Sequence, residues 1–199
     1  TTRGSSIHHY DGTTLSTVTF PSSYTVRKVL LLAGYFIAIR NHGAGEFYWS
    51  ALLDGTDWDS LDFANAESAP DGIRDALVIG DELWFFGEDT IETWAPTGVS
   101  AAPFARVQAR LYRKGVIQLG CAVEIDNAPF WVGDDAVVYR AGDVPTRISD
   151  HAIEQAVRES TASDLKLFGF DFNGHSMIIL QTTNTTFAYD VASGLWSVW

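Results

Sequence analysis

The sequence is poor in the features that mark membrane, secreted or disulfide-linked proteins. Its 199 residues include one cysteine, Cys121, which excludes a disulfide framework, and the small and apolar neighbours of Cys121 are typical of a buried thiol. No apolar run approaches the roughly 20 residues of a membrane-spanning helix, so we expect no membrane as a partner. The sequence starts at Thr1 without an initiator Met or a signal-peptide pattern, and we therefore expect a fragment of a longer protein.

Positive charge is also scarce. The chain has 13 Lys and Arg residues against 25 Asp and Glu residues, which gives a formal net charge of -12 and a pI near 4.6. Because binding to phosphates needs concentrated Lys and Arg, this balance predicts no specific nucleic-acid binding and leaves only a local contact with DNA open. An apolar content of 46% with 13% aromatic residues indicates a globular chain with a sizeable core.

Motifs for catalysis are lacking as well. No Gly-x-Ser-x-Gly turn or phosphate-binding glycine loop occurs, and the histidines do not follow a metal-ligand spacing. The densest run of carboxylates, residues 54–62, lacks the order of a calcium-binding loop, and a solvated hairpin loop is the better interpretation. From these motifs we predict no catalytic, metal-binding or cofactor-binding residue.

The sequence does contain a repeat of short apolar runs separated by turns. In the clearest unit, residues 75–98, runs too short for helices alternate with Gly-Asp and Gly-Glu-Asp and predict antiparallel strands joined by tight hairpins. The first turns of such units fall at residues 34, 80, 127 and 174, a period of about 46 or 47 residues, which is typical of four-stranded propeller blades. One helix is expected at residues 150–158, where Asp150 can cap an apolar face that includes Ile153 and Val157.

This period predicts an all-β fold, a β-propeller-like repeat of four-stranded antiparallel blades in a single domain over residues 1–199. We interpret residues 7–20 as a half-blade and expect complete blades at about residues 26–64, 73–108, 116–149 and 164–199. Four and a half blades leave an open edge, which is a liability unless more chain or a partner covers it. The chain is thus expected to be a fragment of a larger propeller.

One local group of cations stands out from the acidic background. Arg106, Arg110, Arg113 and Lys114 lie close together in the sequence and are mixed with apolar residues. They are either the solvated edge of an outer strand or a contact patch for an acidic partner surface or nucleic acid. They are the candidate partner-contact residues of the chain.

Tryptophans offer an alternative function of another class. Together with paired carboxylates they could serve a carbohydrate-binding or glycoside-active β-propeller, in which the rings would be sugar platforms. The candidates are Trp49, Trp58, Trp84, Trp94 and Trp131. Most of these rings lie at repeat positions, where packing in the core is the expected role. A protein-binding scaffold of cellular origin is a third interpretation.

Several islands of sequence resemble a known family. In order and approximate spacing, five islands are similar to the packaged-DNA stabilisation proteins of short-tailed bacteriophages: residues 10–13, 66–73, 89–94 with 97–98, 114–115 and 189–190. The most specific island is Ala-Glu-Ser-Ala-Pro-Asp-Gly-Ile at residues 66–73, directly before an expected strand. The resemblance extends from about residue 10 to residue 196, and members of the family are longer at both ends.

The resemblance implies a non-enzymatic virion component, a tail accessory or head-completion factor with a propeller-like fold. Such proteins form a homo-oligomeric ring below the portal and its adaptor, help to close the DNA exit channel, and seat the tail needle and tailspikes. It therefore implies these tail proteins as partners, a place in the phage tail, assembly in the bacterial host cytoplasm, and a gene of a phage or prophage. An acidic surface would suit such a channel, because DNA would not be trapped on it.

Overall fold

The structure is a computed structural model that describes residues 6–42, 45–66 and 71–199. It is all-β, as predicted, and contains four four-stranded antiparallel sheets in which neighbouring strands follow one another in the sequence. The first sheet consists of β3 (Val26–Leu32), β4 (Tyr35–Arg40), β5 (Glu46–Trp49) and β6 (Phe63–Asn65). The second consists of β7 (Asp75–Ile79), β8 (Glu82–Phe86), β9 (Ile91–Pro96) and β10 (Phe104–Tyr112).

The third sheet consists of β11 (Ala122–Ile125), β12 (Ala128–Val132), β13 (Val138–Arg140) and β14 (Thr146–Arg147). The fourth consists of β15 (Lys166–Phe172), β16 (His175–Gln181), β17 (Thr186–Asp190) and β18 (Leu195–Val198). Before them comes a two-stranded hairpin of β1 (His8–Tyr10) and β2 (Leu15–Thr17). The helical elements are η1 (Pro21–Ser23), α1 (His151–Arg158) and η2 (Ala162–Asp164). In the described part of the chain, no helix has the length and apolar character needed to cross a membrane.

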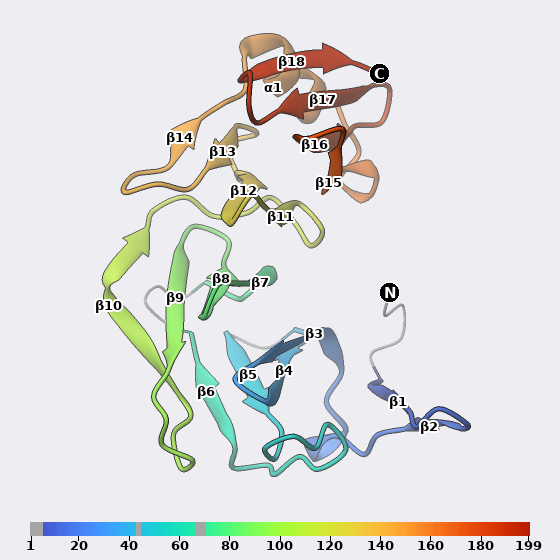
Figure 1. Ribbon diagram of the computed structural model, residues 1–199, viewed down its shortest axis with the longest axis vertical. Helices are drawn as coiled ribbons and strands as arrows, with labels where there is room; N and C mark the ends of the chain where they lie inside the picture. Colours follow the sequence, from blue (N-terminus) through green and yellow to red (C-terminus); the bar gives the residue numbers. More distant parts are fainter. Residues whose placement is uncertain (1–5, 43–44, 67–70) are drawn as a thin grey trace.

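The four sheets follow one another in an arc (Figure 1). The inner strands β3, β7, β11 and β15 lie side by side on the concave side, and each sheet extends outward from there. The hairpin β1–β2 lies near one end of the arc and the fourth sheet forms the other end. This radial arrangement of four-stranded sheets is that of propeller blades, so the predicted fold class is confirmed.

Tight turns set the period of the repeat. At the first turn of the third and fourth sheets, both central residues have positive φ, namely Asp126 and Asn127 at 52° and 53° and Asn173 and Gly174 at 49° and 82°. Two-residue turns of this kind match the twist of antiparallel strands, and Asn, Asp and Gly are the residues that adopt them most readily. The local sequence therefore determines where each inner hairpin reverses.

The core lies between the sheets rather than within them. Between the first and second sheets, the rings of Phe47 and Phe85 are 4.5 Å apart and both are fully buried. Between the second and third sheets, Phe86 contacts Trp131 edge-on at 5.9 Å. A sheet of this fold thus buries its apolar side chains only when a neighbour packs against it.

One element differs from the prediction and another confirms it. The outer strand of the second sheet continues to Tyr112, beyond the expected end at residue 108, and its register with β9 shifts between Arg106 and Leu111. Such an irregularity bends a strand and lets it follow the rim of the fold. The expected helix is present as α1, and Asp150 caps it by accepting a hydrogen bond from the backbone N–H of Ile153 at 3.0 Å.

A polar contact that recurs along the chain joins neighbouring sheets. Arg27 donates from Nη1 to the carbonyl oxygen of Arg74, 3.2 Å away and 47 residues later. Arg74 in turn donates to the carbonyl of Ile117 at 3.0 Å, and Gln118 donates to the carbonyl of Leu165 at 2.9 Å. Each of these side chains thus donates a hydrogen bond to a backbone carbonyl in the segment just before the inner strand of the next sheet. These hydrogen bonds help to hold neighbouring sheets together.

Candidate functional site

The four basic residues predicted as a contact edge lie at the outer end of the second sheet. Arg106 and Arg110 are on β10, and Arg113 and Lys114 follow it in the connection to the third sheet. The strand runs along the outer rim of the arc (Figure 1). The site is therefore on the convex side, away from the inner strands.

Both arginines of the strand are paired within the chain. Arg106 Nε lies 3.1 Å from a carboxylate oxygen of Glu92, which is buried on β9. Arg110 forms an ion pair with Glu82 on β8, and its guanidinium lies 5.6 Å from the centre of the Trp84 ring. These contacts hold the outer strand against the two strands inside it, and they neutralise most of the charge that the sequence displays here.

Lys114 is paired as well, with a residue of the third sheet. Its Nζ lies 2.7 Å from Oδ2 of Asp135, which also accepts a hydrogen bond from the Tyr139 hydroxyl at 2.7 Å. Burial alone would raise the pKa of Asp135, but hydrogen bonds from Lys114, Tyr139 and the Val137 backbone outweigh it and lower this pKa. The hydrogen bond to Asp135 also raises the pKa of Lys114, so the amine stays charged. Arg113 alone of the four is exposed without an ion pair to the described residues.

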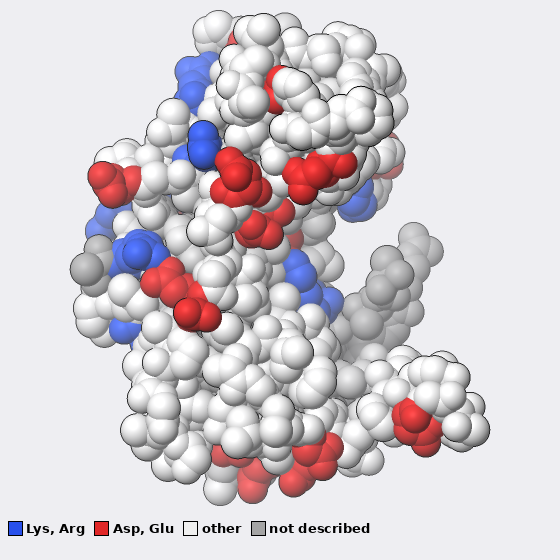
Figure 2. All heavy atoms as spheres, in the orientation of Figure 1, with Lys and Arg blue, Asp and Glu red and all other residues white. Residues whose placement is uncertain are grey.

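The charge on the surface follows the same pattern. On the face that Figure 2 shows, Lys and Arg side chains lie in small separate groups, with Asp and Glu beside several of them, and they form no continuous basic patch there. Acidic side chains gather at the lower edge of this view, where the connection between β5 and β6 lies. A partner that approaches the basic edge would thus meet Arg113 together with half-exposed, already paired cations.

A groove of about 480 Å³ lies beside this edge, between the second and third sheets. Its walls include the Arg110–Glu82 ion pair and the rings of Trp84 and Tyr112, which stack at 5.6 Å. Burial raises the pKa of Tyr112, whose hydroxyl donates to the carbonyl of Gly142 at 2.8 Å. The Arg110–Glu82 pair and the Tyr112 hydroxyl are thus already engaged, whereas the indole N–H of Trp84 has no hydrogen-bond partner among the described residues. The residues that line the groove include no activated nucleophile or base.

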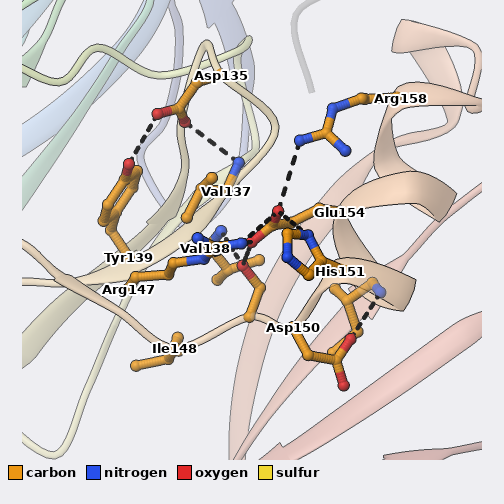
Figure 3. Close-up of polar contacts among 12 residues, drawn as sticks. Asp135, Val137, Val138, Tyr139, Arg147, Ile148, Asp150, His151, Glu154 and Arg158 are labelled. Atoms are coloured by element: carbon orange, nitrogen blue, oxygen red, sulfur yellow. Dashed lines mark hydrogen bonds and ion pairs between the residues drawn. The ribbon is translucent and has the colours of Figure 1, made fainter.

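A polar cluster surrounds the carboxylate of Glu154, on the buried face of α1, and was not predicted from the sequence. Glu154 is fully buried and accepts two hydrogen bonds of 2.7 Å from the guanidinium of Arg147, and one of 2.9 Å from Ser149 (Figure 3). Arg158 and His151 approach the same carboxylate at 3.5 and 3.7 Å. The cluster ties the helix to the third sheet. A signal for it would have been a Glu in the first helical turn soon after an Arg.

The tryptophans considered as sugar platforms are mainly core residues. Four of the five are buried and Trp94 is half-buried. The rings of Phe47 and Trp94 meet edge-on at 5.1 Å. The prediction that these aromatics pack between blades is confirmed for these residues, and they provide no exposed aromatic platform.

The acidic loop has the geometry of a solvated turn. Asp54 accepts hydrogen bonds from the backbone N–H and the hydroxyl of Thr56 at 2.9 and 2.6 Å, and Asp59 accepts one from the backbone of Leu61. Across residues 6–42, 45–66 and 71–199, no three His, Cys, Asp or Glu side chains are arranged to hold a metal ion.

In the island 66–73 that carried the resemblance, residues 67–70 lie outside the described residues. Asp71 accepts hydrogen bonds from the backbone of Asp89 and Thr90.

Comparison of the sequence with known proteins gives two matches of one kind. A sequence model of the family Phage_stabilise, described as bacteriophage P22 Gp10, β-propeller, matches residues 2–199. The tail hub protein gp10 of Salmonella phage P22 is 26% identical over 206 residues, which covers 94% of this chain and 43% of gp10. The chain thus spans less than half the length of this relative.

Solved structures resemble the chain in fold. The computationally designed protein Ika8 is 13% identical with a TM-score of 0.54, over 86% of this chain and 48% of Ika8. The extracellular domain of the putative hybrid two-component system BT4673 from B. thetaiotaomicron is 12% identical with a TM-score of 0.56, over 96% of this chain and 24% of that one. At such identities the likeness concerns the arrangement of the strands alone.

Proposed function

The chain belongs to the family of the bacteriophage P22 Gp10 β-propeller, and from this premise we propose that it is a structural component of a phage or prophage tail. The observation that carries the proposal is the match of the family model to residues 2–199, practically the whole chain. The identity to a tail hub protein supports it. A structural use of charge also agrees with it, because Arg106, Arg110 and Lys114 each pair with a carboxylate of the chain and join strands or sheets.

The specific role that we propose is head closure at the portal vertex and stabilisation of the packaged DNA. In this role the full-length protein forms a homo-oligomeric ring and contacts the portal adaptor, the tail needle and the tailspikes. It assembles in the bacterial host cytoplasm and remains in the virion as a non-enzymatic part of the tail. The net charge of -12 supports a place next to DNA without binding it, since duplex DNA is repelled by an acidic surface.

Co-assembly tests this role. Portal and adaptor rings are mixed with the full-length protein and imaged by electron microscopy, and we expect an added ring of density below the adaptor. Rings without added density, in the presence of well-folded protein, would contradict the proposed role. A filter-binding assay with duplex DNA at low salt provides the second measurement, and strong salt-dependent retention of DNA would contradict the proposed effect of the acidity.

We also propose that the edge formed by Arg106, Arg110, Arg113 and Lys114 contacts an acidic surface of a neighbouring tail protein. Because three of these cations are paired within the chain, Arg113 is the one that a partner carboxylate can engage without breaking an existing ion pair. Arg113→Glu is therefore expected to weaken co-assembly while the free energy of unfolding changes by less than about 0.5 kcal/mol. Arg113→Gln is the matched control, with a smaller effect. Unchanged co-assembly of Arg113→Glu would exclude this contact.

The organisation of the domain is a further part of the proposal. Residues 7–20 form the outer half of one blade, and the blades that follow lie at about residues 26–64, 73–108, 116–149 and 164–199, in a single domain that belongs to a larger propeller. Support comes from the inter-sheet hydrogen bonds of Arg27, Arg74 and Gln118, which repeat with the blades. It also comes from the share of gp10 that the chain matches, 43%.

A further inference from the structure

Three basic side chains meet at a single carboxylate oxygen on α1. Nη2 of Arg147 lies 2.7 Å from Oε2 of Glu154, and Nη2 of Arg158 lies 3.5 Å from the same oxygen. Nδ1 of His151 is 3.7 Å from it. Figure 3 shows the two guanidinium groups approaching the carboxylate from different sides. Two permanent cations are thus held close to each other by one shared anion.

Charge at this cluster is not balanced. Two guanidinium groups share one carboxylate, which leaves an excess of one positive charge even when His151 is neutral. The ion pairs Lys28–Asp75 and Lys114–Asp135, in contrast, each join one cation to one carboxylate. A local excess of positive charge is unusual in a chain whose formal net charge is -12.

The carboxylates that flank the cluster on the helix have other partners. Asp150 accepts a hydrogen bond from the backbone N–H of Ile153 at 3.0 Å, and Glu159 accepts one from the side-chain amide of Gln155 at 2.6 Å. Among the described residues, neither carboxylate forms an ion pair with a guanidinium group. The acids at the two ends of α1 therefore leave the excess charge in place.

Both guanidinium groups have donors left for a further acceptor. The side chains of Arg147 and Arg158 are each 48% exposed. Nη1 of Arg147, and Nε and Nη1 of Arg158, have no hydrogen-bond acceptor within residues 6–42, 45–66 and 71–199. A second anion at these donors would form charge-assisted hydrogen bonds and reduce the repulsion between the two cations.

The buried carboxylate fixes the position of the site. Glu154 is 1% exposed and accepts two hydrogen bonds of 2.7 Å from Arg147 and one of 2.9 Å from the hydroxyl of Ser149. The oxygen of this hydroxyl also accepts a hydrogen bond from the backbone N–H of Val138 at 3.0 Å. The guanidinium of Arg147 is therefore oriented before a ligand arrives, which lowers the entropy cost of binding.

We propose that Arg147 and Arg158 form a binding site for a carboxylate on the surface of another protein, with Glu154 as the buried anchor of the site. The planar fork of a guanidinium group matches the two oxygens of an Asp or Glu side chain. Exposed groups on a helix suit a protein surface, because they can be reached without entering a cavity. The inference is independent of the role in the tail and of the edge that contains Arg113.

Nucleic acid fits the same cations less well. Binding of a polyanion depends on many Lys and Arg residues that displace counterions from successive phosphates. The cluster supplies two permanent cations, and the net charge of -12 repels a long chain of phosphates. A single carboxylate on a partner carries little charge beyond the site and avoids this repulsion.

Titration with a small dicarboxylate tests the chemistry of the site. The whole chain is labelled with ¹⁵N, and the Nε–Hε resonances of its arginines are followed by NMR while glutarate is added at constant pH and ionic strength. We expect saturable shifts for Arg147 and Arg158. Arg40, which is paired with Glu46 in the first sheet, should not shift. Glutaramide, the neutral analogue of glutarate, should leave all of these resonances unchanged.

A variant of Arg158 separates binding from folding. Arg158→Gln removes the long contact of 3.5 Å and keeps both hydrogen bonds of Arg147 to Glu154, so the helix should stay in place. It is expected to weaken the affinity for glutarate by about tenfold. Lys166→Gln is the matched control, because it removes one exposed cation from the fourth sheet, and it should leave the affinity unchanged.

Four results would overturn the proposal. They are a lack of saturable shifts with glutarate, equal shifts with glutaramide, equal affinities of the Arg158→Gln and Lys166→Gln variants, and tighter binding of inorganic phosphate than of glutarate. The last result would assign the site to phosphate groups. Should Arg158→Gln fail to fold, Arg158→Lys replaces it, since it keeps the charge but lacks the planar fork and should weaken binding to a smaller extent.

Discussion

Replacement of Asp75 by alanine tests how the sheets are held together. The side chain of Asp75 is 0% exposed and accepts hydrogen bonds from Lys28 Nζ at 2.7 Å and from the backbone N–H of Gly120 at 2.9 Å. Groups from three consecutive blades therefore meet at one carboxylate. In Asp75→Ala, the N–H of Gly120 loses its acceptor and the ammonium of Lys28 loses its counter-ion.

The loss of unfolding free energy in Asp75→Ala depends on how far the ion pair is buried. Removal of one partner of a buried ion pair typically costs about 3–5 kcal/mol. The Lys28 side chain is 28% exposed, so water restores part of its solvation, and we expect Asp75→Ala to lower the free energy of unfolding by about 3 kcal/mol. Asp75→Asn keeps the shape and one acceptor oxygen, and a loss of about 1–2 kcal/mol is expected.

Urea unfolding followed by tryptophan fluorescence and far-UV circular dichroism measures these differences. Asp81→Asn, at an exposed turn position between β7 and β8, is the control and should change the free energy of unfolding by less than about 0.5 kcal/mol. A double mutant with Lys28→Met should lose at least about 1 kcal/mol less than the sum of the single variants. A free energy of unfolding for Asp75→Ala within about 1 kcal/mol of the Asp81→Asn control, at an unchanged m-value, would contradict a role of Asp75 in holding the sheets together.

Three further predictions concern titratable groups. Burial raises the pKa of Cys121 to about 12, so the folded protein should react with a thiol reagent at pH 8 on the order of a thousandfold more slowly than the unfolded chain. The pKa of Asp135 is lowered in the folded state, so its stabilising effect is present above the unfolded value of about 3.9 and is lost as the pH falls through the folded value. The stability of Asp135→Asn should therefore fall less steeply below about pH 4 than that of the wild type. Glu154→Gln weakens the contact with Arg147 and should lower the free energy of unfolding by about 2 kcal/mol in urea, whereas Glu159→Gln, at the exposed end of α1, should have a small effect.

The candidate contact edge shows where prediction from the sequence reaches its limit. Arg110 and Lys114 look like free cations because no acid lies near them in the sequence. Their partners, Glu82 and Asp135, are 28 and 21 residues away. Such pairs form only after strands of one sheet have aligned and two sheets have packed, and no local pattern encodes them. The presence of the cations was predictable, whereas their neutralisation by these acids was not.

Residues close together in the sequence were sufficient to predict the turns, the repeat of strands and the position of the helix. Asn and Gly adopt positive φ at little cost, as Asn173 and Gly174 do in the first turn of the fourth sheet, and the period of about 46 or 47 residues follows from the strands and turns of each unit. The helix cap at Asp150 is likewise a contact over three residues. These features depend on neighbours in the sequence, so the sequence by itself determined the all-β repeat and the position of α1.

Contacts between blades were decided by the tertiary structure alone. Lys28 and Asp75 are 47 residues apart, and Asp75 and Gly120 are 45 apart. The cavity lined by Ile7, Val29 and Leu53 likewise brings together segments that are more than 20 residues apart in the sequence. Which side chains meet across a stack of sheets depends on the register and twist of every sheet together, and this is why these contacts appear only in the folded chain.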